Sequence, residues 1–196
     1  MTQQVGFVAC LVGFPGVGKL TIARILAQMT GAIVVDNHWI NDPILKLVVT
    51  NEGMAAVSDA VWPQVVKVRE AVLETIAALG PPSNSYIFTY AGSDQDPADR
   101  LAFEDYQAVA LRRGAPFIAV RLLCNEQELV TRIQSAERRG RKLTDPNDAI
   151  TNVRGFTPLD PRVLGTLSLD VTNLSAEEAA STIAAHFGLQ PPTAES

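Results

Sequence analysis

The stretch at residues 13–21, GFPGVGKLT, constrains the fold of this chain more than any other part of its sequence. It follows residues 5–12, a nearly continuous apolar run that predicts a strand buried on both faces, as in a parallel sheet. After Lys19, apolar residues recur at helical spacing as far as Gly31, and a glycine at that place is typical of a helix C-terminus. The sequence therefore predicts a buried strand, a glycine loop and a helix in direct succession.

The spacing Gly13-x-x-x-x-Gly18-Lys19 within this stretch is the core of a phosphate-binding loop. Glycines allow the tight turn in which successive backbone N–H groups point inward, and the following helix N-terminus adds partial positive charge. A lysine at this place supplies a full charge to the β- and γ-phosphates of a nucleotide. We disfavour the alternative, a glycine turn without a ligand, because strand, loop, lysine and helix are in register. The residues expected to contact the nucleotide are Gly13, Pro15, Gly16, Val17, Gly18, Lys19, Leu20 and Thr21.

The residue after the lysine departs from the full pattern, which has Ser or Thr there to bind Mg²⁺. Here that place holds Leu20, and the hydroxyl comes one residue later at Thr21. Because one residue turns a helix by about 100°, Thr21 is better placed to bond a phosphate oxygen than to replace the metal ligand. We therefore expect Mg²⁺ to be held by phosphate oxygens and water, an arrangement that this ion favours.

The rest of the chain alternates between apolar runs typical of strands and amphipathic stretches typical of helices. This alternation predicts right-handed connections and a parallel sheet with helices on both faces. The chain has 196 residues, which suits one domain, expected at 1–188 with a tail at 189–196. Ser175 and Glu178 predict a capping box at the start of the last helix. Further strands are expected at 32–36, 86–90, 116–124 and 167–171, and further helices at 43–50, 57–79, 97–113, 126–139 and 176–187.

Charge and cysteine content narrow the class of partner and the compartment. Lys and Arg number 16 against 21 Asp and Glu, whereas proteins that grip nucleic acid are usually basic, so we expect no nucleic-acid partner. The N-terminal apolar run is too short to span a bilayer and follows no basic residue, so we expect no membrane partner. Cys10 and Cys124 lie in apolar runs without a CxxC pair, which is typical of free thiols in a soluble cytoplasmic protein without a zinc site.

A basic segment follows the fourth expected strand. It contains Arg132, Arg138, Arg139, Arg141 and Lys142, with Gly140 among them. Such cations could close over a transferring phosphoryl group, stabilise its charge and exclude water. The alternative is a solvated basic helix end that the helix dipole favours.

The loop and the order of the elements over nearly the whole chain resemble the nucleoside monophosphate kinase-like P-loop family, which includes adenylate, shikimate and gluconate kinases. In adenylate kinases too, the residue after the loop lysine carries no hydroxyl and a threonine follows, as in Leu20-Thr21, although leucine itself is a departure. The resemblance implies an α/β, three-layer P-loop NTPase fold with a five-stranded parallel sheet, helices on both faces and a short basic lid at about 136–155. It also implies ATP with Mg²⁺ as the nucleotide, and phosphate contacts from among Arg132, Arg138 and Arg141.

Asp36 ends the second expected strand, in VVDNHW. Ligands of open α/β sheets gather at the carboxyl ends of the strands, so Asp36 is expected beside the glycine loop. Its carboxylate could orient an acceptor hydroxyl, take its proton or hold a metal-bound water. It resembles the acidic residue with which shikimate- and gluconate-type kinases hold or deprotonate the acceptor. A cap to a turn after the strand is the alternative.

Other residues near the expected strand ends are further candidates. His38 could contact the acceptor, although a lone histidine is more often an ordinary polar residue. Gly92 and Asp94 follow the third strand and either line the same crevice or form a simple turn. Thr172 follows the last strand, where the resemblance implies a contact with the nucleotide base.

Two tryptophans, Trp39 and Trp62, lie in or near the helices on the acceptor side. We expect both to pack in the core; an aromatic wall for a ring substrate is the alternative.

Together these features predict an ATP-dependent small-molecule kinase that transfers the γ-phosphoryl group to a hydroxyl or phosphate acceptor, with catalytic roles for Lys19, Asp36, Arg138 and Arg141. Residues 39–80 hold only three cations, which modestly favours a neutral or weakly charged acceptor over a nucleotide. A non-catalytic nucleotide-binding module and an NTP-hydrolysing P-loop ATPase are the alternatives. We expect the partners to be ATP and the acceptor, and the protein to be a monomer or a homodimer.

Overall fold

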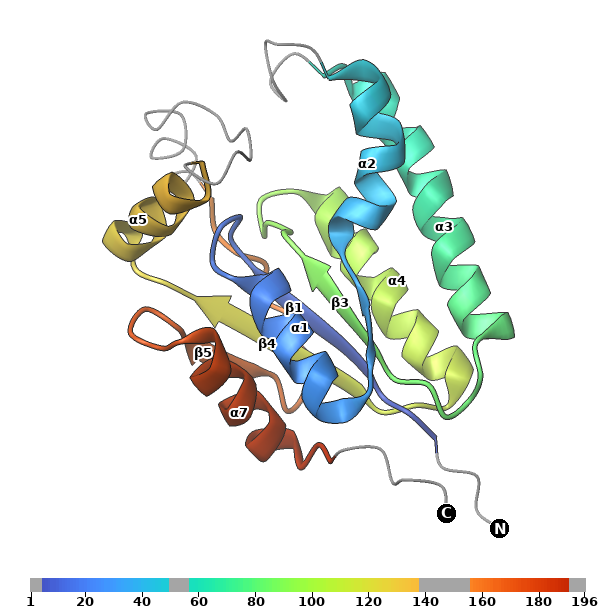
Figure 1. Cartoon of the computed structure of the whole chain (residues 1–196). Coiled ribbons are helices and arrows are strands. Elements are labelled where there is room, and N and C mark those ends of the chain that lie inside the picture. Colours follow the sequence, from blue (N-terminus) through green and yellow to red (C-terminus); the bar gives the residue numbers. More distant parts are fainter. Residues whose placement is uncertain (1–4, 50–56, 138–155, 191–196) are drawn as a thin grey trace.

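The computed structural model describes residues 5–49, 57–137 and 156–190, and its helices and strands alternate along the chain (Figure 1). The strands are β1 (Val8–Gly13), β2 (Ile33–Val35), β3 (Tyr86–Tyr90), β4 (Phe117–Leu123) and β5 (Leu167–Asp170). The helices are α1 (Lys19–Thr30), α2 (Asn37–Val48), α3 (Trp62–Leu79), α4 (Pro97–Arg113), α5 (Glu126–Glu137) and α7 (Ala176–Phe187), with a 3₁₀ turn, η2 (Asp59–Val61), before α3.

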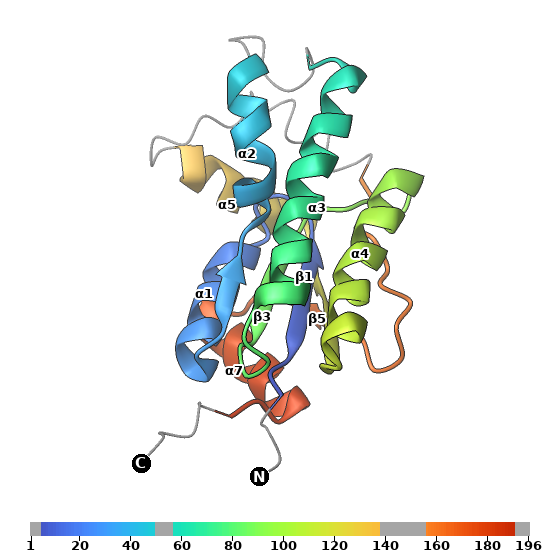
Figure 2. The same cartoon turned by 90° about the vertical axis from the view of Figure 1, so that its right-hand side faces the viewer.

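The five strands form one parallel sheet in the order β2-β3-β1-β4-β5. β1 is central, and every residue of β1 and β3 is buried, as their apolar sequences predict. Helices α2, α3 and α4 cover one face of the sheet and α1 and α7 cover the other (Figures 1 and 2). The predicted α/β fold with helices on both faces is confirmed.

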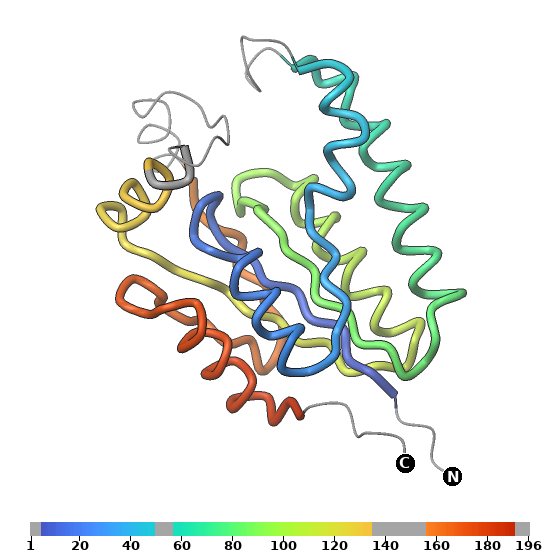
Figure 3. Tube along the Cα trace, viewed as in Figure 1, coloured from blue at the N-terminus to red at the C-terminus, as the bar shows by residue number. Residues whose placement is uncertain are grey.

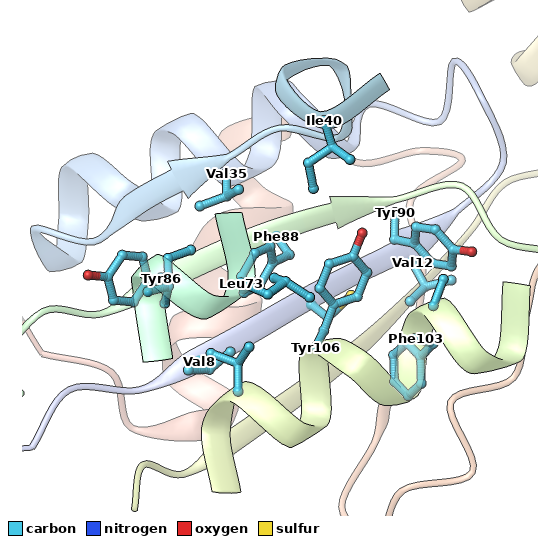
Figure 4. Packing of buried hydrophobic residues seen from close by; sticks show 14 of the residues in the cluster. Val8, Val12, Val35, Ile40, Leu73, Tyr86, Phe88, Tyr90, Phe103 and Tyr106 are labelled. Carbon is cyan, nitrogen blue, oxygen red and sulfur yellow. The ribbon is translucent and has the colours of Figure 1, made fainter. Parts of the chain in front are cut away.

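The core under α2, α3 and α4 is rich in aromatic side chains (Figure 4). Tyr106 of α4 stacks on Phe88 of β3 with ring centroids 4.7 Å apart and meets Tyr90 edge-on at 5.4 Å. Such offset and edge-on contacts stabilise a core beyond the area they bury. They fix α4 against β3, and so fix the carboxyl edge of the sheet where β3 ends.

Local sequence features account for several of the helix ends. Gly31 and Gly114 adopt left-handed conformations at the ends of α1 and α4, with φ of 70° and 61°. Ser175 and Glu178 form the predicted capping box of α7. The predictions for Gly31 and for the capping box are confirmed because each depends on residues that are close together in the sequence.

Helix α2 starts earlier than expected. We predicted a helix at 43–50, but α2 begins at Asn37 and contains Pro43 in its interior. Asp36 is therefore the N-cap residue of a helix, and no separate turn intervenes. The helix expected from residue 57 begins at Trp62, after η2.

The expectation that both tryptophans pack in the core is wrong. Trp39 is 60% exposed and Trp62 is 41% exposed. Helix α2 buries Ile40 and Leu45 instead, which lie on another face of the helix.

Among the described residues, no helix combines the length and the apolar character that crossing a membrane requires.

Candidate nucleotide and acceptor site

The glycine loop joins β1 directly to α1, so the carboxyl end of the central strand points at the start of a helix (Figure 3). Gly16 and Gly18 have φ of 88° and 103°, a region that side chains with a Cβ rarely adopt. A Cβ on Gly13 would lie 2.8 Å from the Leu122 carbonyl oxygen, and one on Gly16 would lie 2.7 Å from a side-chain carbon of Ile133. Gly13 and Gly16 are thus required because the loop packs too closely against β4 and α5 to leave room for a side chain.

The start of α1 fits an anion. The first N–H groups of any helix have no partner in a preceding turn, and the N-cap Gly18 offers no side chain to accept from them. The helix dipole concentrates partial positive charge at the same point. These unpaired donors are the feature that the phosphates of a nucleotide require.

Lys19 is folded back over the loop. Its Nζ donates to the carbonyl oxygens of Gly13 at 2.8 Å and Phe14 at 2.9 Å. Burial lowers the pKa of Lys19 to about 7, and the nearby negative charge of Asp36 opposes that shift. The ammonium group is therefore held where it lacks a full counter-charge, which a bound phosphate would supply.

The residues after the lysine differ in exposure. Leu20 is partly buried, whereas Thr21 is exposed. Among the described residues, no three His, Cys, Asp or Glu side chains form a group that could hold a metal ion. Mg²⁺ bound by phosphate oxygens and water fits this arrangement.

Asp36 is buried and makes a specific contact. Its Oδ1 accepts a hydrogen bond from Oγ1 of Thr89 at 2.8 Å, and the same Oγ1 accepts from the N–H of Asn37 at 3.1 Å. The Asp36 side chain makes no N-cap hydrogen bond to α2, so a simple cap does not describe its role. Thr89 instead fixes one carboxylate oxygen, in a position where Asp36 also acts on the charge of Lys19.

Arg132 of α5 binds the loop from outside. Its guanidinium donates to the carbonyl oxygens of Val17 at 3.1 Å, Val171 at 2.7 Å and Thr172 at 3.2 Å, while its Nε pairs with Glu128 at 2.8 Å. Arg132 therefore joins the glycine loop to the turn between β5 and α7. The phosphate contact predicted for Arg132 stays a prediction, and it would require some of these bonds to be exchanged.

Thr172 lies in that same turn, which Arg132 joins to the glycine loop. Its Oγ1 accepts from the N–H of Asn125 at 2.9 Å. The predicted contact with the nucleotide base is untested, and the hydroxyl is already engaged in the structure.

The loop after β3 contains Gly92 and Asp94. The two carboxylate oxygens of Asp94 accept from Arg100 at 2.9 Å and from the N–H of Asp160 at 3.1 Å. The Gly92 carbonyl oxygen accepts from the N–H of Leu159 at 2.9 Å. These bonds tie the loop to residues 157–162, so they favour a structural role for Asp94, and its acceptor role stays a prediction.

The remaining predicted residues lie apart from this geometry. His38 is exposed, and its Nδ1 lies 3.1 Å from Oδ1 of Asp42 within α2. Arg138 and Arg141 lie outside the described residues, as does the predicted lid from residue 138 onward.

Sequence reasoning missed Thr89 and Asp99. Asp99 of α4 accepts from the Tyr90 hydroxyl at 2.6 Å and from the N–H of Ser93 at 2.8 Å, and so fixes the end of β3. A threonine in the apolar strand YIFTY was the available signal for Thr89, because a polar side chain in a buried strand needs a partner.

Comparison with solved structures places this geometry in a known fold. The chain is similar to a gluconokinase from Sinorhizobium meliloti at 17% identity, with 95% of this chain and 94% of that chain covered and a TM-score of 0.62. It is similar to a sugar kinase from Janibacter at 17% identity, 94% and 95% coverage and a TM-score of 0.59. It is also similar to a shikimate kinase from Acinetobacter baumannii, in complex with shikimate, at 14% identity, 91% and 90% coverage and a TM-score of 0.55.

The chain has the P-loop kinase fold. The resemblance read from the glycine loop is confirmed at the level of the fold. No protein-family model matches the chain, and no curated protein matches it significantly.

Proposed function

We propose that this protein is an ATP-dependent phosphotransferase that moves the γ-phosphoryl group of ATP to a hydroxyl of a small molecule. One observation carries the proposal: the buried carboxylate of Asp36, at the end of β2 and held by the hydroxyl of Thr89, lies close enough to Lys19 of the glycine loop for its negative charge to oppose the lowering of the lysine pKa. A cation for phosphate beside a buried, oriented carboxylate is the arrangement that hydroxyl phosphorylation requires.

The chain's own groups supply binding, charge and proton transfer. The N–H groups of the loop and of the first turn of α1 hold the phosphates, and Lys19 stabilises the negative charge that develops on the β–γ bridging oxygen. Asp36 accepts the acceptor proton while the acceptor oxygen bonds to the γ-phosphorus and the bond from that phosphorus to ADP breaks. Mg²⁺, when bound, supplies further neutralisation of the phosphate charge.

Arg138 and Arg141 are proposed to add positive charge over the transferring group, as a lid does in the family that the sequence resembles. Arg132 is proposed to set the position of the loop, and Thr172 that of the base. We expect the reaction to take place in the cytoplasm, in keeping with the free cysteines Cys10 and Cys124.

The experiment is a transfer screen with ATP labelled at the γ-phosphate. Nucleosides, sugars, sugar acids and other hydroxylated compounds are offered, and labelled organic phosphate is separated from labelled inorganic phosphate. The proposal expects an acceptor-dependent organic phosphate that is lost in Lys19→Ala and Asp36→Asn. Inorganic phosphate alone, released at a rate that no acceptor changes, would favour an ATPase; ATP binding without any turnover would favour a binding module.

A further inference from the structure

Helix α2 carries an apolar stripe on its exposed face. Trp39, Pro43 and Leu47 recur every four residues, so their side chains line one side of the helix. All three are exposed, Trp39 at 60% and Leu47 at 79%. Isolated exposed apolar residues are ordinary, but three in one row with an indole among them form a surface suited to a ligand.

The stripe begins at the proposed reactive group. Asp36 is the N-cap residue of α2 and precedes Trp39 by three residues, which places it at the foot of the same helix face. Figures 1 and 2 show α2 rising beyond the carboxyl edge of the sheet with α3 packed along another side. Because a helix rises 1.5 Å per residue, the stripe extends about 16 Å from Asp36 to Leu47.

The charge of this region disfavours an anionic ligand. Residues 37–80 contain three basic residues against five acidic ones. Two of the three basic side chains are paired with a carboxylate, and the third is hydrogen-bonded to a neutral amide. Lys46 lies 2.7 Å from Asp42, Lys67 donates to Gln64 at 3.2 Å, and Arg69 lies 3.3 Å from Asp105.

We propose that the acceptor is an uncharged alcohol with an apolar or aromatic body, which lies on Trp39, Pro43 and Leu47 while its hydroxyl meets Asp36. This inference rests on the proposed function and adds the class of acceptor to it. The flat indole face stacks on the body of the acceptor, and the excess of acidic over basic residues in this region gives little attraction for a carboxylate or phosphate group. A nucleotide monophosphate or a sugar acid is a poor acceptor on this account.

Binding can be measured apart from turnover. In a Trp62→Phe protein, Trp39 is the only tryptophan, since the chain has two, so its fluorescence reports on the stripe directly. Arylalkyl alcohols and aromatic glycosides are titrated against glucose, gluconate and a nucleoside monophosphate, with and without ATP. We expect the aromatic alcohols to change the Trp39 emission at lower concentrations than any of the polar compounds.

Matched variants test the stripe itself. Leu47 and Leu79 are exposed to 79% and 78%, but Leu79 ends α3 at the far end from Trp62, so Leu79→Ala is the control for Leu47→Ala. Trp39→Ala and Leu47→Ala should each weaken binding of the best aromatic alcohol, by about tenfold for the indole and severalfold for the leucine, and Leu79→Ala should not. ATP affinity should be the same in all three variants.

The inference is overturned if Trp39→Ala binds the alcohols as tightly as the unaltered protein. It is also overturned if sedimentation shows a dimer that Leu47→Ala dissociates, because a second copy would then cover the stripe. Alcohol binding at Trp39 without any phosphoryl transfer would uphold the stripe as a binding site for this class of ligand and refute the proposed function. Transfer to a polar acceptor that Trp39→Ala leaves unchanged would uphold the proposed function and refute the inference.

Discussion

The glycine loop and helix α2 meet at the same edge of the sheet, but different parts of the chain form their surfaces. The loop offers backbone N–H groups and one lysine, and it is held in place by Arg132 and by the edge-on contact of Phe14 with Phe156 at 4.9 Å. Helix α2 offers side chains, among them the exposed Trp39 and Leu47. A backbone surface binds what every nucleotide shares, whereas a side-chain surface can differ with each acceptor.

This difference predicts separable effects. Substitutions at the loop should change the affinity for ATP whatever the acceptor, and substitutions at the acceptor side should change turnover or acceptor choice and leave ATP binding intact. Lys19 and Asp36 lie where the two regions meet, so substitutions at these two residues are the ones that could change both ATP affinity and turnover.

The largest effect is expected from Asp36→Asn. If Asp36 orients the acceptor hydroxyl and takes its proton, the variant should lose about 10²–10⁴ in kcat, the usual span for a positioned proton acceptor. Steady-state kinetics with the identified acceptor gives this value, and the melting temperature serves as the control for folding. An unchanged kcat would remove Asp36 from the catalytic step.

Lys19→Ala should act on the nucleotide. It removes a charge-assisted contact of about 1.5–3 kcal/mol, which corresponds to roughly ten- to a hundredfold in ATP affinity. Calorimetric titration with ATP measures the change, and Lys67→Ala, an exposed lysine of α3, is the matched control. Equal ATP binding by Lys19→Ala and the unaltered protein would refute the assignment of the loop as the nucleotide site.

Thr89→Val should reduce kcat by about tenfold, because Asp36 then loses the hydrogen bond that orients it. Thr89→Ser keeps the hydroxyl and should restore most of the lost rate. A structural role alone would lower the melting temperature of Thr89→Val while kcat at a permissive temperature stayed unchanged. A loss of kcat in Thr89→Val that Thr89→Ser restores would show that Thr89 positions Asp36.

The smallest effect concerns the proton on Lys19. Burial lowers its pKa from 10.5 to about 7, so between these values the unfolded chain holds a proton that the folded protein has lost. The contribution of Lys19 to the free energy of unfolding therefore rises as the pH rises across this window. Bound phosphate favours the charged lysine, so near pH 8 ATP binding should take up about one proton.

Calorimetry in two buffers with different ionisation enthalpies measures that uptake. Lys19→Arg is the control, because its guanidinium stays charged at this pH and should show no uptake. Identical uptake by the lysine and arginine proteins would show that another group titrates.

The nucleotide side could be predicted from the sequence because its determinants are local. The glycine loop, the Gly31 cap and the Ser175–Glu178 box each depend on a few adjacent residues. Pro43 misled the prediction of α2, since proline at a helix start is favoured and proline inside an exposed helix is merely tolerated.

The acceptor side could be predicted only in part. Asp36 was expected from its place at a strand end, but its contact with Thr89 joins residues 53 positions apart, and no local pattern contains that pairing. The exposure of Trp39 was also missed, because an apolar side chain is assigned to the core unless the helix face it occupies is known.

The measurement that tests the separation most directly is a calorimetric titration of Mg·ATP into Asp36→Asn. If Asp36 serves the acceptor, the dissociation constant should stay within about twofold of the unaltered protein, because an uncharged side chain of the same shape leaves the phosphate-binding loop intact. A weaker affinity for Mg·ATP that excess Mg²⁺ partly restores would contradict this account, since Asp36 would then hold the metal-bound water of the nucleotide.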